Sequence, residues 1–246
     1  MTPLLAMAGA AALALSSARP VALEDAAADE YIAAHHRLEH REISVQQLFL
    51  AATRLHDQLL ARRGSEPTLL ERLDPQAYLA LERRLAAHGI VVNQEEIVFA
   101  AVEPAFFLDL ARKYGDASDR EFFATYGRMY PPGKGYIWPA YVEQQTDASG
   151  CTSFAPHKLV DLYGRWQLYR SRFPGDYQQA VAASIRDIES QLCAASCACE
   201  DRETVAAELK TFLARFPQDK IASQVAARLR AIEAGRSTTR FHCLSG

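Results

Sequence analysis

The sequence of 246 residues contains no run rich in lysine or arginine, and its formal net charge is −3. Nucleic-acid phosphates and anionic lipid surfaces are bound by basic faces, so this absence argues against both as partners. The composition, 49% hydrophobic and 23% charged, is otherwise that of an ordinary globular protein. We therefore expect one large domain or two small ones, with no nucleic-acid partner.

Motifs of common reaction centres are also missing. There is no Gly-x-Ser-x-Gly elbow, and the segment PPGKGY at residues 131–136 lacks the Lys-Ser/Thr pair of a phosphate-binding loop. Acidic pairs do occur, Glu95 with Glu96 and Asp116 with Asp119, and paired carboxylates are what a glycoside hydrolase uses. Capping of helix starts accounts for acids of this kind, so we expect no catalytic residue. We also expect no metal and no cofactor.

Residues 1–18 have the pattern of a secretory signal peptide. The apolar run from Pro3 to Leu15 is too short to span a bilayer. The small residues Ser16 and Ala18 suit a signal peptidase that cuts before Arg19. We therefore expect a periplasmic or secreted protein, with no membrane insertion after the signal is removed.

Strand signals are sparse, whereas helix signals recur along residues 19–130. Ser44 with Gln47 forms a capping pair before an apolar stripe of helical spacing, and Asn93 has the pattern of a further helix start. The one possible strand, at Ile90–Val92, is too short to carry a sheet. The predicted class is all-α. The early histidines are expected on a solvated charged helix near the mature N-terminus: His35, His36 and His40.

Residues 158–246 contain a duplicated pattern. An apolar stripe and its copy 43 positions later both end in Arg-Phe-Pro, and each is followed by a second helical segment. This pattern predicts two helix hairpins of about 43 residues each. The matching positions are Leu162, Trp166, Tyr169 and Phe173, and then Val205, Leu209, Phe212 and Phe216.

The segments "LYRSRFPGDYQQAVAASIRDI" and "TFLARFPQDKIASQVAARLRAI" make about residues 158–234 resemble the tetratricopeptide-like helix-hairpin repeats of bacterial envelope proteins. Those repeats often carry an aromatic-x-x-x-Phe-Pro ending on the first helix and an alanine-rich second helix. The unit here is longer than the family's 34 residues, and two units are visible. The resemblance implies architecture only, a helical bundle or short α-solenoid of stacked hairpins, and transfers no functional residues.

Cysteine is scarce, with five residues, three of them inside "QLCAASCACE". In an oxidising compartment thiols pair, so we expect two disulfides and one unpaired cysteine. The hairpin arrangement gathers all five at one end of the bundle. The predicted pairs are Cys151–Cys193 and Cys199–Cys243, with Cys197 as the alternative to Cys199. A second interpretation, three thiolates with His242 around zinc or cuprous copper, has cysteine spacing that is weak for zinc.

Residues 131–157 form an aromatic connection rich in proline and glycine, which we expect to be irregular. Tyr130, Tyr136, Trp138 and Tyr141 are candidate binding residues, because Tyr and Trp supply much of the energy at protein interfaces. The alternative is that these rings plug the seam between the two helical parts.

These patterns favour an exported, disulfide-stapled, all-α protein that binds another protein of the cell envelope. Two roles fit: an envelope adaptor, or an inhibitor or immunity protein that blocks a toxin or hydrolase. The alternative function is a cell-envelope hydrolase that uses carboxylates of the N-terminal half.

Overall fold

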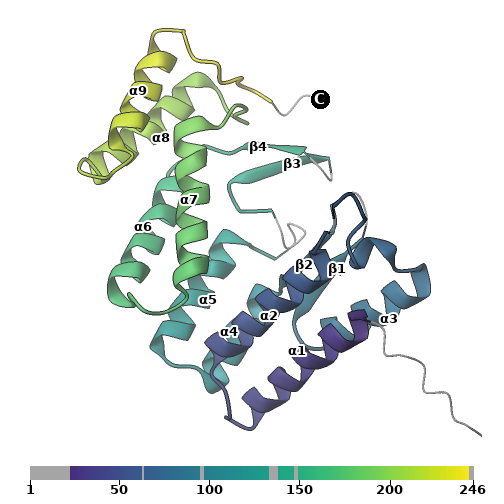
Figure 1. Cartoon of the computed structure of the whole chain (residues 1–246). Coiled ribbons are helices and arrows are strands. Elements are labelled where there is room, and N and C mark those ends of the chain that lie inside the picture. The colour runs from purple at the N-terminus through teal and green to yellow at the C-terminus, as the bar shows by residue number, and fades with distance from the viewer. Residues whose placement is uncertain (1–22, 63, 95–96, 133–137, 147–148, 244–246) are drawn as a thin grey trace, which may run out of the picture.

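In the computed structural model, the described residues are 23–62, 64–94, 97–132, 138–146 and 149–243. The expected signal peptide, residues 1–18, lies outside them. The described part is mostly helical and has two small antiparallel sheets (Figure 1). None of its helices combines the length and the apolar character needed to cross a bilayer.

The described residues of the N-terminal half form five helices, a short 3-10 turn and one hairpin. Helix α1 packs on α2 and α3, and α2 packs on β2 and α4. The expected capping pair begins α2: Gln47 N–H donates to Ser44 Oγ at 3.1 Å, and Ser44 N–H donates to Gln47 Oε1 at 2.8 Å. The elements are α1 (Leu23–Glu39), α2 (Val45–Leu60), η1 (Leu70–Arg72), α3 (Pro75–Ala86), β1 (Ile90–Asn93), β2 (Phe99–Val102), α4 (Pro104–Tyr114) and α5 (Ala117–Met129).

The first sheet corrects the all-α prediction. Strand β1 pairs with β2, and its apolar side chains alternate so that Ile90 and Val92 are buried. The helix start expected at Asn93 is wrong, because the Asn93 amide donates to the Ile97 carbonyl oxygen at 2.5 Å within the hairpin. Three β-branched or aliphatic residues were enough for a strand once a partner strand followed.

In the C-terminal half, the part of the chain that the structure describes has a second hairpin followed by four helices. Helix α6 packs on α7 and α8 packs on α9, while α6 also contacts α8 and α7 contacts α9. The hairpin lies in residues 131–157, so the connection that we expected to be irregular contains a two-stranded sheet. The elements are β3 (Val142–Thr146), β4 (Ser149–Thr152), α6 (Lys158–Arg172), α7 (Gln178–Ala194), α8 (Arg202–Arg215) and α9 (Ala222–Glu233).

The two Arg-Phe-Pro turns have closely similar geometry. Phe173 follows α6 and Phe216 follows α8, each with φ near −130° and each packed on the last aromatic ring of its helix. The ring centroids are 5.2 Å apart for Tyr169 with Phe173 and 5.3 Å for Phe212 with Phe216. The turns are thus built alike, and the duplication of whole hairpins stays a prediction.

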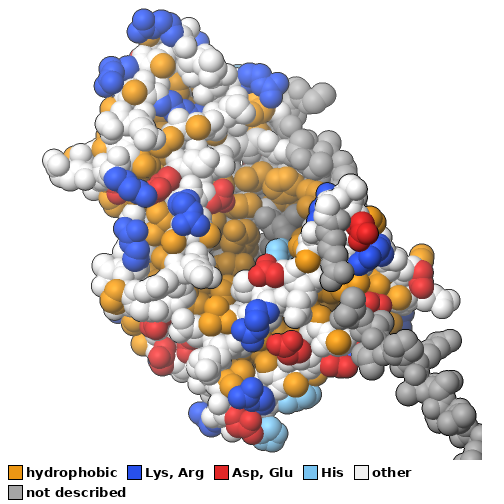
Figure 2. Space-filling view, in the orientation of Figure 1, with side chains coloured by type: hydrophobic (Ala, Val, Ile, Leu, Met, Phe, Trp, Pro, Cys, Tyr) orange, Lys and Arg blue, Asp and Glu red, His pale blue; other side chains and the backbone are white. Residues whose placement is uncertain are grey.

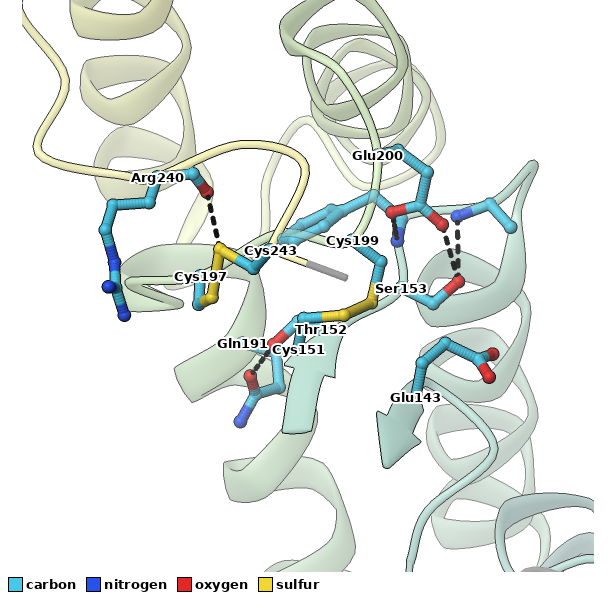
Figure 3. Close-up of a disulfide and its surroundings, with 12 residues drawn as sticks. Glu143, Cys151, Thr152, Ser153, Gln191, Cys197, Cys199, Glu200, Arg240 and Cys243 are labelled. Atoms are coloured by element: carbon cyan, nitrogen blue, oxygen red, sulfur yellow. Dashed lines mark hydrogen bonds between the residues drawn. A yellow bond between two sulfur atoms is a disulfide. The ribbon is translucent and has the colours of Figure 1, made fainter. Parts of the chain in front are cut away.

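Two disulfides join segments near the end of α7 (Figure 3). Cys151 is bonded to Cys199, with Cα atoms 5.1 Å apart, and Cys197 is bonded to Cys243, with Cα atoms 6.0 Å apart. Cys193 is the free thiol. The expected pairs Cys151–Cys193 and Cys199–Cys243 are therefore wrong, and the alternative partner of Cys243 is the one observed.

Main-chain pairing explains this choice of partners. The Cys199 N–H donates to the Thr152 carbonyl oxygen at 3.0 Å, and the Cys243 N–H donates to the Ala198 carbonyl oxygen at 3.0 Å. Residues 197–199 thus lie between β4 and the C-terminal segment, and each disulfide joins two neighbours. Cys193 belongs to the last turn of α7 and is outside this arrangement. With four sulfurs oxidised, the three-thiolate metal site with His242 is not formed.

Two buried charges cap helices of this half. Glu208 accepts hydrogen bonds from the His157 and Val160 N–H groups, at 2.8 and 3.0 Å, where α6 begins. Burial raises the pKa of Glu208 and lowers the pKa of Arg228 to about 10. A carboxylate at a helix start and a guanidinium at a helix end both suit the helix dipole. Arg228 donates to carbonyl oxygens around the end of α7, those of Gln191, Leu192 and Ala195.

Candidate functional site

A cavity of about 440 Å³ opens between α2 and the start of α7. Its apolar lining includes Phe49 and Leu50 from α2, and Tyr177 and Ala180 from the α7 side. Leu50 is 42% exposed, although large apolar side chains are usually covered. Amide and hydroxyl groups complete the lining, among them those of Gln46, Thr53, Gln178 and Gln179.

A second cavity, of about 250 Å³, lies where α2, β2 and α5 meet. Phe49 and Thr53 line both cavities, so the two adjoin along α2, and we call them together the α2 cleft. Figure 2 shows the hollow between the two halves, with hydrophobic side chains on its wall. The other residues around the second cavity are Ala52, His56, Ala100, Ala101, Val102, Tyr126 and Tyr130.

Helix α2 has two apolar faces, which is why it can line a cleft and also belong to the core. One face, with Leu48 and Leu55, is buried against the rest of the N-terminal half. The other face, with Phe49, Leu50 and Thr53, follows the three- and four-residue spacing of a helix and turns toward α7.

Aromatic rings hold the two halves together beneath the cleft. Phe122 of α5 stacks on Tyr177 with ring centroids 3.8 Å apart and an interplanar angle of 10°. Phe49 meets Phe122 and Tyr177 nearly edge-on, at 5.4 and 5.5 Å. The Tyr177 hydroxyl donates to Asp119 Oδ1 at 2.5 Å, which fixes the ring in the cleft floor.

The outer edge of β2 faces the cleft with its main chain. The Glu103 N–H donates to the Gly89 carbonyl oxygen at 2.8 Å, which marks a hydrogen-bonded pair at the end of the ladder. Bonded pairs alternate along antiparallel strands, so Ala100 and Val102 turn their main-chain groups away from β1. His56 Nδ1 donates to the Ala100 carbonyl oxygen at 2.7 Å, whereas the outward groups of Val102 have no partner among the described residues.

The chemistry of the α2 cleft is neutral. Across the described ranges, the residues that line either cavity include no Lys, Arg, Asp or Glu. Burial raises the pKa of Tyr130 to about 12 and also raises the pKa of Tyr126, so both phenols stay protonated at neutral pH. Such a lining favours apolar side chains and uncharged hydrogen-bonding groups over ions.

The structure separates the three described rings among the four proposed for binding. Tyr130 lines the α2 cleft. Trp138 is half-buried and lines neither cavity, and Tyr136 lies outside the described residues. Tyr141 is fully buried and its hydroxyl donates to Asp187 of α7, so its ring belongs to the core, in keeping with the plug alternative. The expectation that Tyr141 is a binding residue is corrected accordingly.

Sequence reasoning missed the cleft residues Phe49, Leu50 and Tyr177. A signal for the first two existed, because they stand beside the main apolar stripe of residues 45–60 and widen it beyond one face. Tyr177 gave none. Its place follows from a left-handed backbone conformation, with φ 50°, at the start of α7.

Two of the four acids considered for hydrolysis have structural partners. Asp116 and Asp119 form a reciprocal capping box at the start of α5, with both N–H to carboxylate distances 3.0 Å. Neither lines the α2 cleft. Glu95 and Glu96 lie outside the described residues.

Comparisons with known proteins add nothing to the geometry of the site. No family model, no curated protein and no solved structure matches this chain. The resemblance of residues 158–234 to tetratricopeptide-like hairpins accordingly stays a prediction, and the α2 cleft is the feature from which a function can be argued.

Proposed function

We propose that this chain is an exported, periplasmic protein-binding module that receives a segment of another cell-envelope protein in the α2 cleft. The observation that carries the proposal is the uncharged, largely apolar lining of two adjoining cavities around Phe49. Their volumes, about 440 and 250 Å³, suit a few side chains. Exposed Leu50 at the rim gives a partner an apolar contact in water.

The partner segment is extended where it meets β2. Outward main-chain groups at Val102 offer a donor and an acceptor to a further strand, as sheet edges do in strand addition. Glutamine side chains on the opposite rim can both donate to and accept from a peptide main chain. An apolar side chain of that segment then enters the larger cavity beside Tyr177.

The proposal also covers the compartment of the protein and its role. The signal-like residues 1–18 and the two disulfides support an oxidising compartment. Stacked helix hairpins in the C-terminal half would give the cleft a rigid wall. An adaptor and an inhibitor or immunity protein would use the same cleft, and they differ in whether the bound partner loses its activity.

Site-specific photocrosslinking tests the proposal in cells of the source organism. A benzophenone amino acid at Leu50 is compared with one at Leu79 on α3, because these leucines are 42% and 43% exposed. We expect a discrete crosslinked product, identified by mass spectrometry, from position 50 alone. Equal products from both positions, or none from position 50, would contradict the proposal.

A further inference from the structure

Two histidines meet at the seam between α1 and α3, away from the α2 cleft. His35 of α1 and His88, which follows α3, have their Nδ1 atoms 2.9 Å apart. His35 is only 6% exposed, so the expectation of a solvated early histidine is wrong at this position. The same seam carries a hydrogen bond of 2.8 Å from the Tyr31 hydroxyl to the His88 carbonyl oxygen.

The contact assigns the protons of both rings. A neutral imidazole has one N–H, so one facing Nδ1 donates and the other accepts. His35 Nε2 is buried without a hydrogen-bond partner in the described structure, and an N–H there would be left unpaired. His35 therefore donates from Nδ1, and half-buried His88 accepts at Nδ1 and carries its own proton on Nε2, within reach of water.

A further proton on His88 disfavours this arrangement. Either both facing nitrogens carry hydrogen, or the proton of His35 moves to Nε2, where it is buried without an acceptor in the described structure. The surroundings oppose that proton on balance. His36 of α1 has its ring centroid 5.6 Å from that of His88, and Arg84 of α3 adds positive charge near His88. Lys113 of α4 adds positive charge near His35. Glu39 is the acid that favours protonation, and it is hydrogen-bonded to His36 Nδ1 at 2.9 Å.

We propose that the His35–His88 contact holds the second half of α1 on α3 at neutral pH and releases it on acidification. Burial first, and neighbouring positive charge second, lowers the pKa of both rings. The open form thus binds protons that the closed form does not, beginning below the ordinary histidine value of about 6.5. Closure is undiminished above that pH and is lost as the pH falls. The site makes the protein sensitive to an acidified exterior, independently of any partner.

Hydrogen–deuterium exchange of the mature protein tests the proposal. After correction for intrinsic exchange rates, peptides covering residues 28–39 are compared at pH 7.5 and 5.0. We expect their protection to fall about tenfold per pH unit for each imidazole that gains a proton on opening. Helices α8 and α9 serve as the internal reference and should keep their protection.

The decisive variant is His88→Asn, whose amide oxygen can accept from His35 Nδ1 without gaining a proton near pH 6. It should reduce the pH dependence to that of one imidazole or less. His40→Asn, an exposed histidine of the same chain segment, should leave it unchanged. The proposal would be overturned if protection in the wild type did not change with pH. It would also be overturned if the His88→Asn and His40→Asn substitutions changed the pH dependence equally. If His88→Asn fails to fold, ¹⁵N NMR of the wild type decides, and a proton on His35 Nε2 at pH 7.5 would refute the assignment.

Discussion

Removal of the Cys151–Cys199 disulfide should cost the protein a large share of its stability. The two cysteines are 48 residues apart, and a loop of that length corresponds to about 4 kcal/mol in the chain-entropy treatment. Both residues are buried, so Cys151→Ala with Cys199→Ala also leaves a small void that adds to the loss. Natural domains are stable by about 5–15 kcal/mol, so this double variant should approach the threshold of folding.

Two further variants make the comparison sharp. Cys197→Ala with Cys243→Ala opens a bridge across 46 residues and should also cost about 4 kcal/mol. Cys193→Ala removes the free thiol and should change the free energy of unfolding by less than about 1 kcal/mol. The expected ranking distinguishes the observed pairing from the pairing suggested by chain order.

Urea unfolding without reductant, followed by circular dichroism, measures the three free energies. Peptide mapping supplies the direct check of connectivity, since trypsin leaves Cys193, Cys197 and Cys199 in one peptide of residues 187–202. Fragmentation of that peptide must therefore locate the bond to Cys151. A Cys193→Ala variant as unstable as the double variants, or a bond from Cys151 to Cys193, would refute the reasoning.

Three other perturbations probe the buried polar groups. Arg228→Met removes the guanidinium donors from three carbonyl oxygens at the end of α7 and should cost about 3 kcal/mol, or a melting temperature lower by about 6–12 °C in calorimetry; an unchanged melting temperature would contradict this role. Glu208→Ala removes the acceptor for two N–H groups at the start of α6 and should cost about 2 kcal/mol in urea unfolding, whereas Glu208→Gln, which keeps one acceptor oxygen, should cost less. Stability should also fall above pH 10 by about 1.4 kcal/mol per pH unit for each tyrosine that ionises only when unfolded. The urea midpoint is measured between pH 9 and 11 in a Cys193→Ala background, which prevents thiol exchange. A constant midpoint would refute the predicted loss of stability. Burial raises the pKa of seven of the ten tyrosines: Tyr31, Tyr126, Tyr130, Tyr141, Tyr163, Tyr169 and Tyr177.

Local sequence signals predicted the helices well, because their causes lie within a few residues. The Ser44–Gln47 capping pair and the apolar positions of α2, which follow a three- and four-residue spacing, are examples. The hairpin of β1 and β2 was missed because a strand of four residues depends on its partner rather than on its own length. His35 was misplaced because its burial depends on α3, which lies about 50 residues away in the chain.

The candidate site shows the same division. The hairpin pattern predicted that the sulfurs gather near one end, but not which pairs form. The choice depends on main-chain hydrogen bonds that join Thr152 to residues 197 and 199, and Ala198 to residues 240 and 243. Tyr130 was found from its residue type. Tyr141 has the same type, and an acceptor on α7, Asp187, draws it into the core. The sequence of α2 allows Phe49 and Leu50 to be predicted as a second apolar face. The opposite wall of the cleft, around Tyr177, comes from a turn far away in the chain.

The most direct test of the α2 cleft is the affinity of the purified partner, once captured, for matched surface variants. Leu50→Glu and Leu79→Glu change leucines of nearly equal exposure, so each should alter folding stability by less than about 0.5 kcal/mol. Isothermal titration calorimetry should show binding weakened at least about tenfold by Leu50→Glu, equivalent to about 1.4 kcal/mol, and unaffected by Leu79→Glu. Wild-type affinity in the folded Leu50→Glu variant would contradict a partner site in this cleft.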